Sequence, residues 1–322
     1  MRGSAKSTVD SGFLFAGMLA AAAYFSADTP DQREIRELAD ALYRRADWPW
    51  LQTDTGTIGH GWKPESGFIH YRWEGFDEAL LLYMLALGSP THPLPPDSYT
   101  AWVSTYEWKH CYGIDCLYCG PLSTHQLSHA WIDFRGIQDE FVRRKGIDYF
   151  ENSRRSTLVQ QRYAIHNPLG FNGYGQHSWG ITASDGPSPD VRRIDGIERH
   201  FFDYEGCGAP FGIDDGTLAP WAVVASLPFA PDIVLPTIHH FVLTLQFHDQ
   251  HRYGFKATFN QSFDGNPQSP AGWVSPWHYG LNLGPIVLMI ENHLGGMIWN
   301  LMRGSPYVVD GLRRAGFAGG WL

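Results

Sequence analysis

The chain of 322 residues is long enough for one large domain or two ordinary ones. Hydrophobic residues make up 43% of it and charged residues only 18%, so the composition predicts a substantial core and excludes a disordered chain. The formal net charge of −9 argues against a nucleic-acid partner and against binding to anionic membranes.

The first apolar stretch, residues 12–25, is too short to span a bilayer. Basic residues before this stretch and small residues within it also fit a signal peptide. Against that, the acidic Asp10 lies between the basic residues and the apolar stretch. Leu14 and Met18 fall on one helical face, so we predict a helix of the mature protein over residues 9–26. A second helix is predicted over residues 30–46 from the same spacing of apolar residues.

The most informative stretch is residues 71–93, where acids follow a tryptophan and precede an unbroken apolar run. We predict a helix over residues 76–87 with Asp77 and Glu78 in its first turn, because the helix dipole stabilises negative charge there. Glu74 and Glu78, four apart, then share a face. Acids beside an aromatic ring are also what a sugar-cleaving enzyme needs. The stretch therefore fits either a charged helix start or a catalytic site.

Further helices are predicted from apolar residues at helical spacing, over residues 97–108, 122–131, 148–165, 218–226, 231–247, 285–302 and 306–315. Strand signals are sparse, and long loops such as residues 48–72 and 167–217 separate the helix pairs. This pattern predicts an all-α fold, an α/α toroid whose loops gather at one end and form a cleft. No linker divides the chain, so we predict a single domain over residues 1–322.

Metal-binding patterns are present only in part. A C-x4-C-x2-C spacing begins at Cys111, but the fourth cysteine, Cys207, is far away, so we predict reduced, partly buried thiols. His125 and His129 are four apart on the predicted helix over residues 122–131, a spacing that can bind zinc. No glutamate stands between them and no third ligand is evident, so we expect no metal and no other cofactor.

Several segments together resemble a known family. They are residues 7–11, 74–93, 128–136, 148–153, 179–187, 214–220 and 284–292. This set is similar to the glucoamylase-like glycoside hydrolases that include bacterial endo-β-1,2-glucanases, to which the transglycosylating domain of cyclic β-1,2-glucan synthases is related. The resemblance covers nearly the whole chain, and its segments WGITASDGP and EALLLYMLALGSPTHP are long and specific.

The resemblance implies an (α/α)6 barrel with its active site at the loop end. It also implies that Glu78 is the general acid and that Asp10 stands where family members carry an acid in an early barrel helix. Glu74 is the local alternative to Glu78. Family members have further helices before the segment that matches Ser7, so we expect the barrel to be incomplete at its N-terminus.

Glycoside hydrolysis needs a second carboxylate besides the proton donor. The sequence leaves Asp10, Asp133, Asp185, Asp214 and Asp215 open for this role, and it leaves both inverting and retaining chemistry open.

Substrate contacts are expected from motif positions that the resemblance places on the site side, among them His129, Arg135 and Asp185. Asn282 stands where many relatives have an aspartate. Thirteen tryptophans are also available, and those near the motifs are candidate sugar platforms, with core packing as the alternative. The expected substrate-binding residues are Trp73, His129, Trp131, Arg135, Trp179, Asp185, Asp215 and Asn282.

These observations together predict a glycoside hydrolase that cleaves β-linked glucan, with β-1,2-glucan or its oligosaccharides as the implied substrate. Two alternatives stay open: a glucan transglycosylase of the same fold, and a non-catalytic glucan-binding fragment. The expected partner is the glucan itself, with no nucleic acid and no membrane span.

Overall fold

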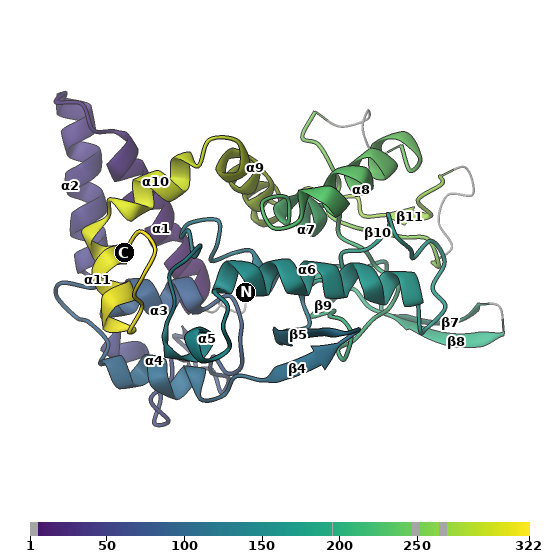
Figure 1. Cartoon of the computed structure of the whole chain (residues 1–322), viewed down its shortest axis with the longest axis horizontal. Helices are drawn as coiled ribbons and strands as arrows, with labels where there is room; N and C mark the ends of the chain where they lie inside the picture. Colours follow the sequence, from purple (N-terminus) through teal and green to yellow (C-terminus); the bar gives the residue numbers. More distant parts are fainter. Residues whose placement is uncertain (1–5, 195, 247–251, 264–268) are drawn as a thin grey trace. The chain divides into compact units, whose positions relative to one another are not determined.

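The computed structural model describes residues 6–194, 196–246, 252–263 and 269–322, and these form two compact units. The first unit consists of residues 6–107, 127–150 and 296–322, and the second of the described residues within 108–126 and 151–295. Both units are helix-rich, and their strands are only two to five residues long (Figure 1). Within the described ranges, none of the helices combines the length and apolarity needed to cross a bilayer.

The first unit contains a small antiparallel sheet and a set of helices. Its strands, in their order across the sheet, are β1 (Lys6–Ser7), β2 (Gly61–Lys63) and β3 (Gly67–Phe68). Its helices are α1 (Thr8–Tyr24), α2 (Pro30–Arg44), α3 (Leu80–Leu87), α4 (Pro96–Val103), α5 (Glu140–Arg144), α10 (Met297–Arg303) and α11 (Pro306–Arg314), with a 3₁₀ turn η1 (Pro49–Leu51).

The second unit combines helices with two-stranded antiparallel pairs. The pairs are β4 (Trp108–Cys111) with β5 (Ile114–Leu117), β6 (Ser184–Asp185) with β9 (Tyr204–Glu205), β7 (Asp190–Ile194) with β8 (Ile197–Phe201), and β10 (Phe259–Asn260) with β11 (Trp273–Val274). Its helices are α7 (Pro220–Ala225), α8 (Pro231–Leu243) and α9 (Gly280–Leu294), with a 3₁₀ turn η2 (Leu122–His125). Helix α6 (Tyr149–His166) begins with the last residues of the first unit and otherwise belongs to the second.

Helix α3 lies at the centre of the first unit. Its sequence has no polar face, and all of its residues are buried, as expected for a helix that is apolar all round. It packs against α1 and α11. The hydroxyl of Tyr43 on α2 donates to the carbonyl of Leu85 at 2.6 Å, and the hydroxyl of Tyr83 accepts from the backbone N–H of Ile58 at 3.1 Å. These bonds hold α3 to the elements that surround it.

The contact between α3 and α11 depends on two glycines. A Cβ atom at Gly311 would lie 1.9 Å from the carbonyl oxygen of Met84, and one at Gly88 would lie 1.8 Å from that of Tyr307. Because no side chain fits at such distances, glycine at both positions lets the two helix backbones approach each other directly.

The core of the second unit forms around α7, which packs against both α8 and α9. All residues of α7 are buried, and they join a cluster of large rings that includes Trp179, Phe241 and Phe259. The cysteines are free thiols, with Cys111, Cys116 and Cys207 buried and Cys119 partly exposed, as predicted.

Most helices predicted from periodicity are confirmed within a few residues. These are the predictions over residues 9–26, 30–46, 148–165, 218–226, 231–247 and 306–315, of which residue 247 lies outside the described ranges. The predicted helix over residues 97–108 is shorter in the structure. It corresponds to α4, which ends at Val103, and residue 108 already belongs to β4.

Three other predictions are wrong in their boundaries or type. The helix over residues 122–131 is only the 3₁₀ turn η2 followed by turns, so His125 and His129 do not share a helix face. The helix over residues 285–302 is two helices, α9 and α10, because Gly296 adopts a left-handed φ of 67° between them. The stretch over residues 167–217 is not irregular throughout, since it contains β6 to β9.

Adding one methyl group at Gly311 tests the contact between α3 and α11. We expect Gly311→Ala to lower the free energy of unfolding by about 1–3 kcal/mol, because the new Cβ forces the helices apart. The matched control is Gly284→Ala in α9, where a Cβ would meet no atom within 4 Å. It should raise stability by roughly 0.5–1 kcal/mol through helix propensity. Urea denaturation followed by circular dichroism measures both, and equal stability of the two variants would contradict the contact.

Candidate active site

The acidic stretch lies in front of α3 and not in its first turn. The helix begins at Leu80 with Ala79 as its N-cap residue, so the prediction of acids in the first helical turn is wrong. The carboxylate of Asp77 accepts the backbone N–H of Ala79 at 2.9 Å, a local turn that competes with helix formation. Glu74 and Glu78 consequently do not share a helical face.

Glu78 has the properties of a proton donor. The residue is partly exposed, and burial of its carboxyl group raises the pKa above the ordinary glutamate value. Its own backbone N–H opposes this rise, and the charge of Asp10 adds to it. The hydroxyl of Ser128 donates to the carbonyl of Glu78 at 3.1 Å and accepts the N–H of Leu81 at 3.0 Å. Ser128 thereby holds the backbone at Glu78.

Asp77 is a second buried acid beside Glu78. Burial raises its pKa well above the ordinary aspartate value, and the charge of Glu78 raises it further. Two adjacent carboxyl groups of this kind lose their protons at higher pH than two separate, solvated ones, because two neighbouring negative charges repel in a poorly solvated place.

Asp10 is exposed and lies in the first turn of α1. The side chain of Ser7 caps this helix and accepts the backbone N–H of Asp10 at 3.3 Å. The indole N–H of Trp73 donates to the hydroxyl of Thr8 at 3.0 Å, and that hydroxyl donates to the carbonyl of Gly59 at 2.8 Å. Trp73 is buried and ties the start of α1 to the acidic stretch, which favours the packing role that the sequence left open for it.

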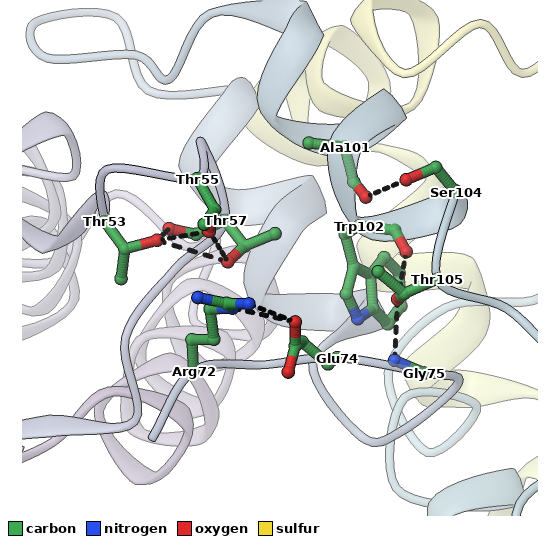
Figure 2. Close-up of polar contacts among 10 residues, drawn as sticks. All are labelled: Thr53, Thr55, Thr57, Arg72, Glu74, Gly75, Ala101, Trp102, Ser104 and Thr105. Atoms are coloured by element: carbon green, nitrogen blue, oxygen red, sulfur yellow. Dashed lines mark hydrogen bonds and ion pairs between the residues drawn. The ribbon is translucent and has the colours of Figure 1, made fainter. Parts of the chain in front are cut away.

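Glu74, the local alternative, has a different environment. Figure 2 shows it joined to Arg72, whose Nε and Nη2 atoms lie 2.8 and 2.7 Å from the same carboxylate oxygen. The next residue, Gly75, donates its N–H to the hydroxyl of Thr105 at 2.7 Å, which fixes the loop before Glu78 (Figure 2). The carboxylate of Glu74 is thus exposed and already paired.

Asp133 lies at the centre of an ion-pair cluster in the first unit. Its side chain has no exposed area, and it accepts bonds from Nε and Nη2 of Arg135 at 2.8 and 2.7 Å and from Arg303. Burial acts to raise its pKa, but the hydrogen bonds and charges of the two guanidinium groups outweigh this and lower it. Arg135 is half exposed, and its guanidinium lies 4.4 Å from the centre of the Trp299 ring. Arg135 and Asp133 thus form a direct ion pair.

His129 and Trp131 lie close to this cluster in sequence. His129 is buried, with its ring edge-on to Phe134 at 4.9 Å, and its carbonyl accepts the indole N–H of Trp299 at 2.6 Å. Trp131 is partly exposed, and the outer edge of its ring faces Gly17 on α1.

The other predicted site residues belong to the second unit. Trp179 is fully buried and donates to the hydroxyl of Thr237 at 2.9 Å, so its ring faces are covered. Asp185 is buried in β6 and accepts bonds from the hydroxyls of Ser275 and Tyr279. Asn282 is buried on α9, and its side-chain nitrogen has no hydrogen-bond partner in the described part of the chain.

The two neighbouring aspartates of the second unit hold its loops. Asp214 accepts the hydroxyls of Tyr163 and Tyr174 at 2.8 and 2.7 Å. Asp215 accepts the N–H of Thr217 at 2.9 Å and that of Phe202 at 3.3 Å. Burial raises the pKa of both carboxyl groups. Because both carboxylates accept hydrogen bonds from groups of the same unit, both aspartates have a structural role that does not depend on a ligand.

Groups of three or more histidine, cysteine or acidic side chains arranged to hold a metal are absent from the residues that the structure describes. Burial lowers the pKa of His125 to about 4, so this ring is neutral at physiological pH.

The raised pKa of Glu78 predicts a pH-dependent effect of Glu78→Gln on stability. A carboxyl whose pKa is raised by folding stabilises the protein below the unfolded value, and this stabilisation is lost as pH rises through the folded value. We therefore expect Glu78→Gln to unfold at a higher temperature than the wild type at pH 7, with the difference shrinking as pH falls toward about 4.

Thermal unfolding between pH 5 and 8 measures this difference. Glu74→Gln is the control, and it should not raise the unfolding temperature, because the Glu74 carboxylate is exposed and paired with Arg72. A Glu78→Gln variant that is less stable than the wild type at pH 7 would show that the Glu78 charge is well solvated.

Comparisons with known proteins identify the family. The family model described as "Putative glucoamylase" matches residues 70–306. The exo beta-1,2-glucooligosaccharide sophorohydrolase (non-reducing end) of Parabacteroides distasonis is 28% identical over 334 residues, which are 95% of this chain and 43% of that protein. The chain thus spans less than half the length of this curated relative.

Solved structures show the same fold. One from Bacteroides uniformis, with the same description as the family, is 32% identical, has a TM-score of 0.84, and is matched over 98% of this chain and 72% of its own. The endo-beta-1,2-glucanase from Chitinophaga pinensis, solved with sophorotriose and glucose, is 25% identical with the same TM-score and the same coverage. The family model matches well over half of the length of this chain, so the chain belongs to the glucoamylase-like family.

Proposed function

We propose that this protein is a glycoside hydrolase that cleaves β-linked glucan, with β-1,2-glucan or its oligosaccharides as the substrate. The observation that carries the proposal is Glu78, a partly exposed residue whose carboxyl pKa is raised by burial, with Asp10 near enough for its charge to act on it. Relatives named as a β-1,2-glucooligosaccharide sophorohydrolase and an endo-β-1,2-glucanase support the choice of substrate.

The chemistry follows from the different surroundings of the two acids. Glu78, which holds its proton to higher pH, donates it to the glycosidic oxygen as the bond to the sugar carbon breaks. Asp10, exposed at the start of α1, supplies the second carboxylate, which activates water or attacks the sugar carbon. Asp77 acts through Glu78 by holding the turn at Ala79, so we assign it a positioning role.

The substrate contacts proposed for the first unit are Trp131 and Arg135, whose side chains are open to solvent. Asp133 positions Arg135 through its ion pairs, and we propose no direct catalytic step for it, because two guanidinium groups already hold its carboxylate. In the second unit we propose Asp185 as a sugar contact from the family resemblance, with its buried carboxylate held by Ser275 and Tyr279.

We also propose that residues 1–322 belong to a single barrel domain of the (α/α)6 type. The helix-rich fold and the TM-score of 0.84 to the family's solved structures support this architecture.

Replacing Glu78 by Gln tests the catalytic assignment. We expect Glu78→Gln to lower kcat on linear β-1,2-glucan by roughly 10²–10⁴-fold, because an amide cannot supply the proton. Its affinity for the glucan should stay within about twofold of the wild type, because the amide keeps the size and hydrogen-bonding capacity of the acid. Glu74→Gln is the matched control and should keep wild-type kcat.

Sugar chromatography of the products separates the alternatives. Shorter oligosaccharides indicate hydrolysis, and products longer than the substrate indicate transglycosylation. If the wild-type protein binds the glucan and releases no product, the enzyme assignment fails. If Glu78→Gln retains the wild-type rate while Glu74→Gln loses it, the proton donor is Glu74.

A further inference from the structure

One face of the β1–β2–β3 sheet carries aromatic side chains that the proposed chemistry does not use. Lys6 pairs with Trp62 across β1 and β2, and Trp62 pairs with Phe68 across β2 and β3. Residues directly opposite each other project to the same face of a sheet, so these side chains form a row. The Trp50 ring, from η1, lies 5.8 Å from the Trp62 ring and 4.8 Å from the Phe68 ring. We call Trp50, Trp62 and Phe68 the aromatic row.

The aromatic row is open to solvent. Trp50 is 49% exposed, Phe68 is 45% exposed and Trp62 is partly exposed. The ammonium of Lys6 lies 5.7 Å from the centre of the Trp62 ring, and Lys6 itself is exposed. Large rings gathered on a surface often mark a binding site. The Trp50 ring is tilted by 55° from the Trp62 ring and by 55° from the Phe68 ring, so each exposed ring offers its own apolar face. An apolar ring face beside a hydrogen-bond donor suits a sugar, which has an apolar C–H face and hydroxyl groups around its edge.

The same sheet connects the aromatic row to the proposed acids. Strand β1 continues directly into α1, so Lys6 and Asp10 are at most about 14 Å apart along the chain. The N–H of Thr8 donates to the carbonyl of His60 at 3.0 Å. His60 comes two residues before Trp62, and its ring is stacked on that of Trp73 at 3.9 Å. Backbone and side-chain bonds therefore connect the start of α1 to the segment that leads into Trp62.

We propose that the aromatic row is a glucan-binding platform, which holds a sugar residue away from the bond that Glu78 protonates. This inference rests on the proposed function and deepens it, because it predicts a dependence on chain length. In this proposal a short oligosaccharide bound at Glu78 and Asp10 leaves the row empty, whereas a longer glucan occupies both places. The favoured substrate is then a chain longer than the minimum needed for cleavage.

Phe68→Ala tests the platform, with Phe211→Ala as its matched control. Phe211 belongs to the second unit, is 62% exposed and, like Trp62, has a lysine ammonium over its ring. On linear β-1,2-glucan we expect Phe68→Ala to raise KM about tenfold with kcat unchanged, which is the scale of one lost ring contact. On a β-1,2-linked trisaccharide we expect wild-type constants. Phe211→Ala should match the wild type on both substrates.

Phe68→Leu controls for misfolding of Phe68→Ala, because it keeps most of the apolar volume but removes the aromatic ring. It should show the same rise in KM as Phe68→Ala, and its urea midpoint should equal that of the wild type. If both Phe68 variants match Phe211→Ala on the long glucan, the platform is excluded. An equal rise in KM on the trisaccharide also excludes it, because the effect then does not depend on length.

Binding without turnover separates this inference from the proposed function. Isothermal titration calorimetry with linear β-1,2-glucan compares Glu78→Gln with the double variants that add Phe68→Ala or Phe211→Ala. A loss of affinity with Phe68→Ala alone supports the platform even if the wild-type protein releases no product. Equal affinity of the three proteins overturns the platform even if the wild-type protein hydrolyses the glucan.

Discussion

The burial of a carboxyl group in front of a helix without a polar face is the constraint on which the structure depends. Helix α3 is buried along its whole length, so the residues that lead into it are drawn toward the core. Asp77 and Glu78 occupy that entry, and burial raises the pKa of each. Burial raises the pKa of such a carboxyl group, which suits it to donate a proton. The same burial destabilises the fold when the group is charged.

The surrounding bonds hold this entry in one geometry. Ser128 bonds both the carbonyl of Glu78 and the N–H of Leu81, so the backbone on either side of the helix start is fixed. Trp73 reaches Thr8 at the start of α1, which brings Asp10 into electrostatic range of Glu78. Because each bond joins segments far apart in the sequence, Asp10 and Glu78 come together only in the folded first unit.

Much of the helical framework could be predicted from the sequence, because apolar spacing in α1, α2, α6 and α11 is set by neighbours along the chain. The start of α3 could not be predicted in this way. Asp77 favours a helix start by its charge, yet its side chain bonds the N–H of Ala79 and delays the helix. The prediction of a helix over residues 122–131 was also wrong. The amino-acid composition of this stretch does not distinguish successive turns from an α-helix.

The site shows the same division between local and distant contacts. Asp133 and Arg135 are separated by a single residue, so their ion pair is a local contact, but Arg303 comes from α10 and joins only in the fold. Glu78 was identified through its resemblance to a family motif, and its assignment as proton donor stays a prediction. The aromatic row was missed, because the pairing of Trp62 with Phe68 depends on the register of strands too short to show alternation.

The pH dependence of kcat/KM on linear β-1,2-glucan tests the central claim most directly, because it reports the titration of the essential acid in the free enzyme. If Glu78 donates the proton, activity falls on the alkaline side with a pKa above the ordinary glutamate value of about 4.3, and Glu78→Gln lacks this limb along with the activity. An alkaline limb at the ordinary glutamate value, or one that persists unchanged in Glu78→Gln, would contradict the account.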